Sequence, residues 1–361
     1  MIMNLEYSGQ GKRGGEKYHA HLHSFLVENF EDVTPVKLRV LPPALSNPIK
    51  HARYNLRLVK KHRPDLIVVD VSSSSRNLLA VRWMKANKKR VLVVVQGQRL
   101  TFRYNNALAR WLVCYFENYL LRGADIVLAN SKYCAELAGH KGKGKPDIVI
   151  APPGLEVEPI SSNGASVGAT ETEGPIKLLF VGECSYRKGV KPLIEALAML
   201  KDFDIHLDVA GRYFREDRYF KEIQGIIEGN NLKNRVTFLG FTERSNLEKL
   251  YRQCSVFVCP SLSEGYGMAL AEAVVYGLPI VATTAGAIPE MVTDDVNGLL
   301  VKPGDPRALA AAIAKLVADH SLRTAISKAN LKRGASLSKW DGFHQILLRE
   351  LAPAINNAIE H

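Results

Sequence analysis

The chain has 361 residues and a mass of 40.0 kDa, which at roughly 100–200 residues per domain predicts two domains. Apolar residues make up 47% and charged residues 23% of the sequence, a balance that excludes a disordered or collagen-like chain.

The formal net charge is +12, and it is unevenly distributed. Residues 1–157 carry 25 Lys and Arg against 12 Asp and Glu, whereas residues 158–361 carry 23 against 24. The first part is thus at +13 and the second at −1, which indicates an anionic partner for the first part alone: a membrane surface, a phosphorylated lipid or nucleic acid. A solvated basic face without a partner is the alternative.

The N-terminus lacks the apolar core of a secretory signal, and no stretch approaches the ~20 apolar residues that span a bilayer. The five cysteines form no CxxC pair and lie mostly among apolar neighbours, as buried thiols of a reducing compartment do. We therefore expect a cytoplasmic protein, with peripheral contact to the cytoplasmic face of a membrane as an option.

Short β-branched runs alternate with helical patterns along the whole chain, which is typical of parallel sheets with crossover helices. Strands are expected over residues 2–7, 36–41, 66–71, 91–95, 126–129 and 148–150, and again over 176–181, 205–210, 236–239, 256–259 and 280–283. The pattern predicts an α/β protein with two doubly wound, Rossmann-like domains that face each other across a ligand-binding cleft.

The expected domain boundaries follow from changes in composition. Residues 159–175 are rich in Ser, Gly, Thr and Pro and have no hydrophobic period, so they predict a linker. The first domain then covers residues 1–158 and the second covers 176–338. Residues 339–361 are expected to form a C-terminal helix that packs back on the first domain.

Two features near the N-terminus bear on ligands. Gly14 and Gly15 precede a predicted helix and leave room for a ligand at its start. On that helix His21 would face away from His19 and His23, and no Asp or Glu completes a ligand set. No metal site is predicted here, and we expect these histidines on the helix surface.

Two further helical stretches of the first domain have unusual faces. The basic residues of the earlier one share one side, which fits either membrane contact or a solvated surface; they are Lys50, Arg53, Arg57, Lys60 and Lys61. The later one has apolar side chains at helical spacing, namely Leu108, Trp111, Leu112, Tyr115, Phe116, Tyr119 and Leu120. We interpret that stripe as core rather than membrane anchor, although Arg99, Arg103 and Arg110 keep an interfacial role open.

In the second domain, Lys188 stands just before Gly189, between a predicted strand and a predicted helix. A lysine at such a turn is well placed to neutralise a departing diphosphate.

The sharpest motif follows the buried strand VFVCP. Glu264 precedes a turn that Gly265 and Gly267 leave open, and Met268 begins a run of good helix formers with Glu272 one turn inside it. Carboxylates accept hydrogen bonds from sugar hydroxyls, and the free amides of a helix N-terminus bind phosphate, so the motif suits a nucleotide sugar. The alternative is that Glu264 only caps a helix and Glu272 is solvated.

With these motifs the chain resembles the retaining glycosyltransferases of family 4, also called glycosyl transferases group 1, which have the GT-B fold. The Glu-(seven residues)-Glu motif of that family matches Glu264 and Glu272, and LPIVATTAGAIPEMV and NGLLVKPGD match the segments that follow. The Gly14-Gly15 loop, PDLIVVD and ENYLLRGADIVLANS match more loosely.

The resemblance implies a role for each matching residue. Lys188 and Glu264 would serve catalysis, with Glu264 on the hydroxyls of the transferred sugar and Glu272 on the ribose. The donor diphosphate would lie against the loop and helix start formed by Gly265, Tyr266, Gly267, Met268 and Ala269, and near Gly15, while Gly14 and Gln96 would lie on the acceptor side. No metal and no cofactor are implied.

Two positions depart from the family pattern. Glu183 stands where the family usually has an arginine, and we expect Arg187 to supply that charge. Gln96 stands where the family commonly has a histidine, and a glutamine cannot act as a base near neutral pH.

The sequence thus predicts a metal-independent, retaining glycosyltransferase that moves a sugar from a nucleotide diphosphate donor, UDP- or GDP-linked, to a hydroxyl acceptor such as a glycan or lipid-linked precursor. One alternative is a nucleotide-sugar epimerase or hydrolase of the same fold, which needs no acceptor. The other is a basic protein that binds membrane or nucleic acid and has a degenerate donor site. No nucleic-acid-binding motif occurs, so nucleic acid is not expected as a partner.

Overall fold

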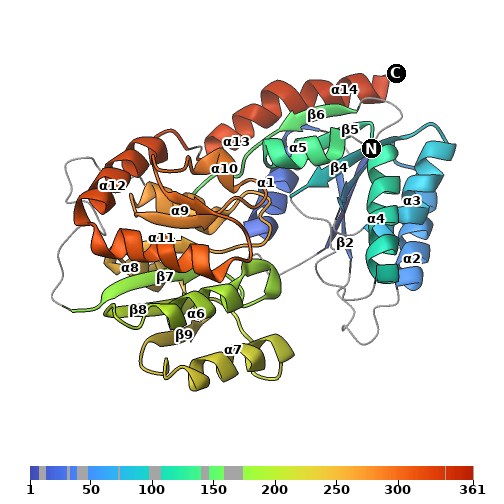
Figure 1. Cartoon of the computed structure of the whole chain (residues 1–361). Coiled ribbons are helices and arrows are strands. Elements are labelled where there is room, and N and C mark those ends of the chain that lie inside the picture. Colours follow the sequence, from blue (N-terminus) through green and yellow to red (C-terminus); the bar gives the residue numbers. More distant parts are fainter. Residues whose placement is uncertain are drawn as a thin grey trace. The chain divides into compact units, whose positions relative to one another are not determined.

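The computed structural model of the chain (Figure 1) describes residues 1–7, 14–30, 33–38, 48–71, 74–96, 107–139, 146–157, 174–337 and 339–360. The chain divides into two compact units. Unit 1 comprises Met1–Gly154 together with Ser338–His361, and unit 2 comprises Leu155–Leu337. Most of the expected linker lies outside the described residues.

Unit 1 is built on six parallel strands in the order β2-β1-β3-β4-β5-β6. The strands are β1 (Ile2–Tyr7), β2 (Val33–Leu38), β3 (Leu66–Asp70), β4 (Arg90–Val95), β5 (Ile126–Ala129) and β6 (Asp147–Ile150). The helices between them are α1 (Gly14–Asn29), α2 (Pro48–His62), α3 (Ser74–Ala86), α4 (Ala107–Arg122) and α5 (Lys132–Gly139).

The alternation of side chains along each strand supplies both faces of this sheet. In β3, Leu66 and Val68 point to one side and pack with α1, whereas Ile67 and Val69 point to the other and pack with α2, α3 and α5. Helices therefore cover both faces, which is why the central strands β3, β4 and β5 are nearly continuous apolar runs.

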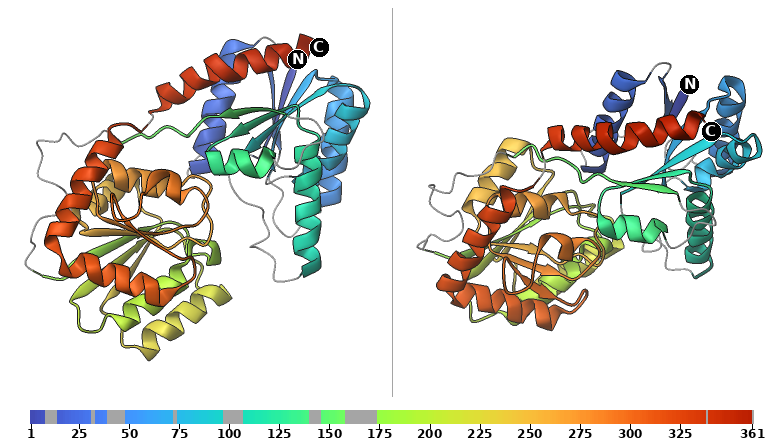
Figure 2. Two further views of the ribbon diagram at one scale, coloured as in Figure 1. Left: turned by 45° about the horizontal axis from the view of Figure 1, so that its top comes forward. Right: turned by 90° about the horizontal axis from the view of Figure 1, so that it is seen from above.

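The C-terminal segment belongs to unit 1 and packs on the α1 side of its sheet. It consists of α13 (Trp340–Ile346), one π-helical turn (Leu347–Leu351) and α14 (Ala352–Glu360). Phe343 meets Tyr18 edge to face at 4.9 Å, and the Tyr18 hydroxyl donates to the Ala151 carbonyl at 3.1 Å. Figure 2 shows this segment, in red, lying along the elements of unit 1.

Unit 2 repeats the scheme with the strand order β12-β11-β10-β7-β8-β9, again all parallel. Its strands are β7 (Ile176–Val181), β8 (Ile205–Ala210), β9 (Val236–Gly240), β10 (Val256–Cys259), β11 (Ile280–Thr283) and β12 (Leu299–Val301). Its helices are α6 (Val190–Met199), α7 (Arg218–Gly229), α8 (Arg244–Gln253), α9 (Met268–Val275), α10 (Ile288–Met291), α11 (Pro306–Ala318) and α12 (His320–Gly334).

The expected fold class is confirmed: both units are doubly wound α/β layers. Six of the expected strands have the bounds predicted for them. The range 36–41 was wrong, because β2 already begins at Val33 and runs through Pro35. Strand β2 lies at the sheet edge and pairs only with β1, so the missing N–H of Pro35 is tolerated there. Strand β12 was missed because an edge strand of three residues carries too little pattern.

The apolar stripe of α4 was assigned to the core, and for its N-terminal half this was wrong. Leu108 is 63% exposed, Trp111 61%, Leu112 38% and Tyr115 52%, whereas Leu120 is buried. The period of the sequence identifies an apolar helix face but not what covers it.

Candidate functional site

The strand order of unit 2 brings two loops together at one edge of its sheet. Strands β7 and β10 are neighbours, and the order of strands reverses between them. Because ligands of doubly wound sheets bind beyond the carboxyl ends of strands at such a reversal, the loops that follow Val181 and Cys259 form the candidate site.

The loop after β7 ends in a single 3₁₀ turn, Tyr186–Lys188, and Gly189 connects this turn to α6. Gly189 has φ +69°, and a Cβ there would overlap the carbonyl oxygen of Pro260 directly after β10. Only a glycine lets the two backbones approach this closely. Lys188 is thereby held beside the loop that carries Glu264.

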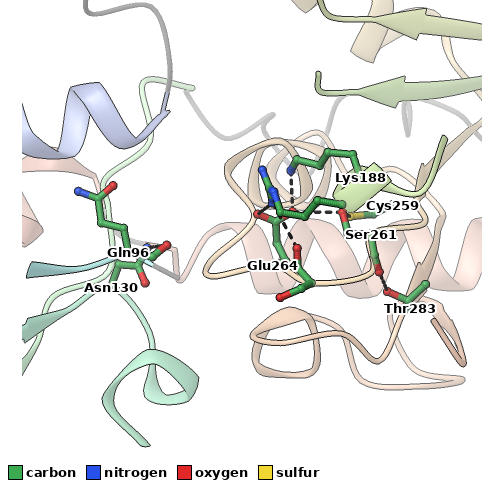
Figure 3. Close-up of polar contacts among 9 residues, drawn as sticks. Gln96, Asn130, Lys188, Cys259, Ser261, Glu264 and Thr283 are labelled. Carbon is green, nitrogen blue, oxygen red and sulfur yellow. Dashed lines mark hydrogen bonds and ion pairs between the residues drawn. The ribbon is translucent and has the colours of Figure 1, made fainter. Parts of the chain in front are cut away.

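Lys188 and Glu264 form the centre of the site (Figure 3). The Lys188 Nζ lies 2.6 Å from Glu264 Oε2, which also accepts a hydrogen bond from Ser261 Oγ at 3.2 Å. Arg187 Nη1 lies 3.6 Å from Glu264 Oε1 and donates to the Ser263 carbonyl at 3.2 Å. Two cations and one hydroxyl thus converge on a single carboxylate.

Glu264 is 7% exposed, and burial by itself raises the pKa of a carboxyl group. Here the charges of Lys188 and Arg187 outweigh burial and lower the pKa of Glu264 below its ordinary value of 4.5. The side chain is therefore a carboxylate at neutral pH, and a carboxylate can only accept hydrogen bonds. It suits contact with the hydroxyl groups of a sugar and not proton donation.

The backbone of Glu264 is fixed from the other side by the loop after β11. The amide of Ala287 donates to the Glu264 carbonyl at 2.9 Å. Gly286 has φ +61°, and a Cβ on it would overlap that same carbonyl oxygen. Thr283, the last residue of β11, donates to the Ser261 carbonyl at 2.6 Å.

Glu272 has its own partner. It lies in α9, and its Oε1 is 2.6 Å from Nη1 of Arg244, the first residue of α8. Arg244 Nε also donates to Glu248 at 3.2 Å. Glu272 is therefore an ion-paired side chain that joins α8 to α9, and it is not merely solvated.

The start of α9 completes this edge of unit 2. Met268 is the first helical residue, and Gly267 precedes it with φ +93°, a conformation that favours glycine. The first amides of a helix have no intrahelical acceptor and carry the positive end of its dipole. Gly265 is buried, while Tyr266, Met268 and Ala269 are half-buried. Burial raises the pKa of Tyr266 to about 12, so its hydroxyl is neutral.

Unit 1 has a comparable edge. Gly14 and Gly15 begin α1, which follows β1, and β1 is the strand at which the order of that sheet reverses. Gln96 directly follows β4, and its carbonyl accepts a hydrogen bond from Asn130 Nδ2 at 3.0 Å. In the part of the chain that the structure describes, the Gln96 Nε2 is buried and makes no hydrogen bond. Gln96 and Asn130 are labelled in Figure 3.

Sequence reasoning missed several contacts of these edges. His19 Nε2 lies 2.9 Å from Asp70 Oδ2 at the end of β3. Arg244 was also missed, although a cation at the first position of a helix, where the dipole disfavours it, signals a specific acidic partner. Glu183 is half-buried, and Arg187 reaches Glu264 alongside Lys188.

The described residues contain no group of three or more His, Cys, Asp or Glu side chains that could hold a metal ion. Across the same residues no helix combines the length and apolarity needed to cross a bilayer.

Comparisons with known proteins agree on one family. The sequence profile described as "Glycosyl transferases group 1" matches residues 167–333, and the profile "Glycosyl transferase 4-like domain" matches residues 20–154. Among curated relatives, a D-inositol 3-phosphate glycosyltransferase of Xylanimonas cellulosilytica is 28% identical over 236 residues, which are 62% of this chain and 56% of that protein. The chain thus spans little more than half of that relative's length.

Several solved structures match nearly the whole chain, among them the following two. Sucrose-phosphate synthase of Thermosynechococcus elongatus has a TM-score of 0.78 at 20% identity and covers 99% of both chains. Anabaena HepE in complex with UDP-glucose has a TM-score of 0.70 at 19% identity and covers 98% of this chain and 99% of that one. At such identities the likeness establishes the fold, which is the GT-B fold of glycosyltransferases. Together with the two profile matches, it shows that the chain belongs to the family 4 type of group 1 glycosyltransferases.

Proposed function

We propose that this glycosyltransferase is a retaining, metal-independent enzyme that moves a sugar from a nucleotide diphosphate sugar, with UDP or GDP as the nucleotide, to a hydroxyl acceptor. The observation that carries the proposal is the Lys188–Glu264 pair of 2.6 Å at the carboxyl edge of unit 2. In this pair a carboxylate suited to sugar hydroxyls lies beside a cation suited to phosphate, and the loop that carries Glu264 leads into α9.

In the proposed reaction, the bond between the anomeric carbon and the phosphate oxygen breaks, and its electron pair stays on the diphosphate. The oxygen of the acceptor hydroxyl bonds to the anomeric carbon on the same face, and its proton passes to the departing phosphate. Negative charge therefore grows on the diphosphate. Lys188, Arg187 and the first amides of α9, near Gly267, would stabilise it, and this kind of stabilisation is often the largest contribution to catalysis.

Other residues would bind the donor without taking part in bond breaking. The ionised Glu264 would accept hydrogen bonds from hydroxyls of the transferred sugar. Glu272 would accept from the ribose, with Arg244 holding its carboxylate in place. Gly15 would approach the donor phosphate, and Gly265, Tyr266, Met268 and Ala269 would shape the pocket around the diphosphate.

The acceptor would bind unit 1, at Gly14 and Gln96. A buried amide such as Gln96 Nε2 is suited to donate to an acceptor hydroxyl. The charge of +13 over residues 1–157 favours an anionic acceptor or one carried on an anionic membrane, such as a lipid-linked glycan precursor. The X. cellulosilytica relative is named for an inositol phosphate, and the HepE structure contains UDP-glucose; both support the proposal.

A thermal-shift series with UDP, GDP, ADP, CMP and their sugar conjugates tests the donor class. A ligand present at 100 times its Kd stabilises the folded state by ~2.7 kcal/mol. We expect a shift with UDP or GDP that is lost in Glu272→Ala. With the responding donor, NMR of the product's anomeric centre then tests retention. Rapid donor turnover without any acceptor would instead indicate a hydrolase or epimerase.

A further inference from the structure

Helix α4 presents large apolar side chains to solvent. Leu108, Trp111, Leu112 and Tyr115 are each between 38% and 63% exposed, and their spacing of three, four and seven residues places them on one helix face. The rings of Trp111 and Tyr115 stack, with their centroids 5.7 Å apart. A grouped apolar face of this kind marks an interaction surface rather than scattered surface variation.

The other end of α4 is firmly anchored in unit 1. Leu120 and Leu121 are buried in the core on the side of the sheet that α2, α3 and α5 cover, and Glu117 is buried as well. The exposed face is therefore the N-terminal half of a helix whose last turns are fixed. In Figure 1 α4 stands beside α3.

The same layer is strongly basic. In α2, Ala52, Asn55 and Val59 are buried, and α2 packs on α3, which in turn packs on α4. Basic side chains of all three helices are exposed, namely Arg53, Arg57, Lys60, Lys61, Arg82 and Arg122. The α2–α3–α4 layer thus combines an apolar helix face with positive charge.

We propose that this α2–α3–α4 layer is a docking surface for an anionic lipid bilayer. A Trp and a Tyr with leucines on one helix face, in a layer whose neighbouring helices expose Arg and Lys, match the composition of a surface that binds at the membrane interface. A second copy of the chain would bring two positive layers together, which the charge opposes. A soluble polyanion would leave the apolar face without a role.

The inference deepens the proposed function, since it rests on an acceptor carried at a membrane. A bilayer bound by this layer holds unit 1, and with it Gln96, close to acceptors that are anchored in lipid. Burial of the four apolar side chains in the bilayer removes apolar surface from water and supplies affinity. The basic residues supply selectivity for anionic lipid.

The test is cosedimentation of the full chain with vesicles of 30% phosphatidylglycerol in phosphatidylcholine, and with pure phosphatidylcholine. We expect binding to the anionic vesicles that weakens in 0.5 M NaCl. Leu112→Ser should weaken it severalfold, and Trp111→Ser/Leu112→Ser about tenfold or more. The matched control is Leu348→Ser, which removes a leucine that is 51% exposed on the C-terminal segment of unit 1 and should leave binding unchanged.

Tryptophan fluorescence gives an independent readout. The emission should shift to the blue when anionic vesicles are added, and Trp111→Phe should remove most of the shift, because Trp340 is buried and Trp83, in α3, is half-buried. The inference would be overturned if the chain did not bind anionic vesicles, or if Leu348→Ser weakened vesicle binding as much as the substitutions in α4. It would also be overturned if the chain formed a dimer that Trp111→Ser/Leu112→Ser dissociates. The thermal shift with nucleotide must survive in the double variant. A chain that binds vesicles but no nucleotide would instead refute the proposed donor chemistry.

Discussion

The Nζ of Lys188 and the Oε2 of Glu264 lie 2.6 Å apart, although 76 residues separate them in the chain. The lysine comes from the turn after β7 and the glutamate from the loop after β10, and the two strands are neighbours. In this state the ammonium group neutralises the carboxylate. Under the proposed function, a bound donor would bring its phosphate to Lys188 and its sugar hydroxyls to Glu264, so the ammonium group would gain an anionic partner and the carboxylate a hydrogen-bond donor.

Replacing Lys188 with Ala should lower the turnover number by about 10²–10³-fold, the scale for removal of one positioned group that stabilises transition-state charge. The folded state should also lose about 3–5 kcal/mol, because Glu264 keeps its charge while buried and retains only the more distant Arg187. Steady-state kinetics and urea unfolding measure the two effects.

The double variant Lys188→Ala/Glu264→Gln separates them. It should recover much of the lost stability but none of the turnover. Lys191→Ala is the matched control, because Lys191 lies three residues further on and pairs with Glu222 at the surface. If Lys188→Ala kept a turnover number near that of the parent, Lys188 would have no role in the mechanism.

The stability of unit 2 should depend on the ionisation of Glu264. The pKa of this group is lowered in the folded state, so its ionised form is stabilised by folding. That contribution is fully present above the ordinary value of 4.5 and is lost as the pH falls through the lower, folded value. The free energy of unfolding should therefore decline more steeply with acidification in the parent than in Glu264→Gln. Glu216→Gln, which removes an exposed carboxylate of the same unit, is the control. Parallel pH profiles for parent and Glu264→Gln would contradict the ion pair.

Arg244 should act on the donor through Glu272. We expect Arg244→Gln and Glu272→Gln each to weaken nucleotide binding, and the double variant to bind no more weakly than Glu272→Gln alone, with a coupling energy of about 0.5–3 kcal/mol. Calorimetric titration with the responding nucleotide measures all three. Arg218→Gln is matched to Arg244→Gln, because Arg218 begins α7 and pairs with Glu222 as Arg244 begins α8 and pairs with Glu248. Additive losses would show that Arg244 and Glu272 act separately.

The sequence predicted the sheets of this protein well, and the reason is physical. Strand β10 is buried along its whole length and β7 over residues 178–180, so each carries an apolar run that the sequence shows directly. The Glu264 loop was also predictable, because the glycines and the helix formers around it have local causes. Gly267 and Met268 stand where the sequence places the end of the loop and the start of α9.

The partners of those residues could not be predicted. Which cation meets which carboxylate depends on strand order, and a single chain pattern does not fix that order. The Arg244–Glu272 pair, which joins two helices 28 residues apart, and the His19–Asp70 contact, 51 residues apart, are of this kind. The exposed half of α4 shows the same limit. The same amphipathic spacing occurs on a helix face that is buried in the core and on one that is exposed.

Gly286 should be essential to the site although it contacts the site only through backbone. Its φ of +61° is strained for any other residue, and an added Cβ would overlap the carbonyl of Glu264. Gly286→Ala should therefore displace the loop that carries Glu264 and destabilise the protein by about 1–3 kcal/mol. The loss of turnover should exceed the loss that lower stability alone would cause.

The matched control substitution is Gly225→Ala, because Gly225 lies inside α7 with no atom near its Cβ position. That change should stabilise the protein by about 0.4–1 kcal/mol and leave turnover unchanged. Thermal unfolding and kinetics of both variants, measured at a temperature where each is fully folded, decide the matter. If Gly286→Ala kept the turnover of Gly225→Ala, the position of Glu264 would not depend on this backbone contact.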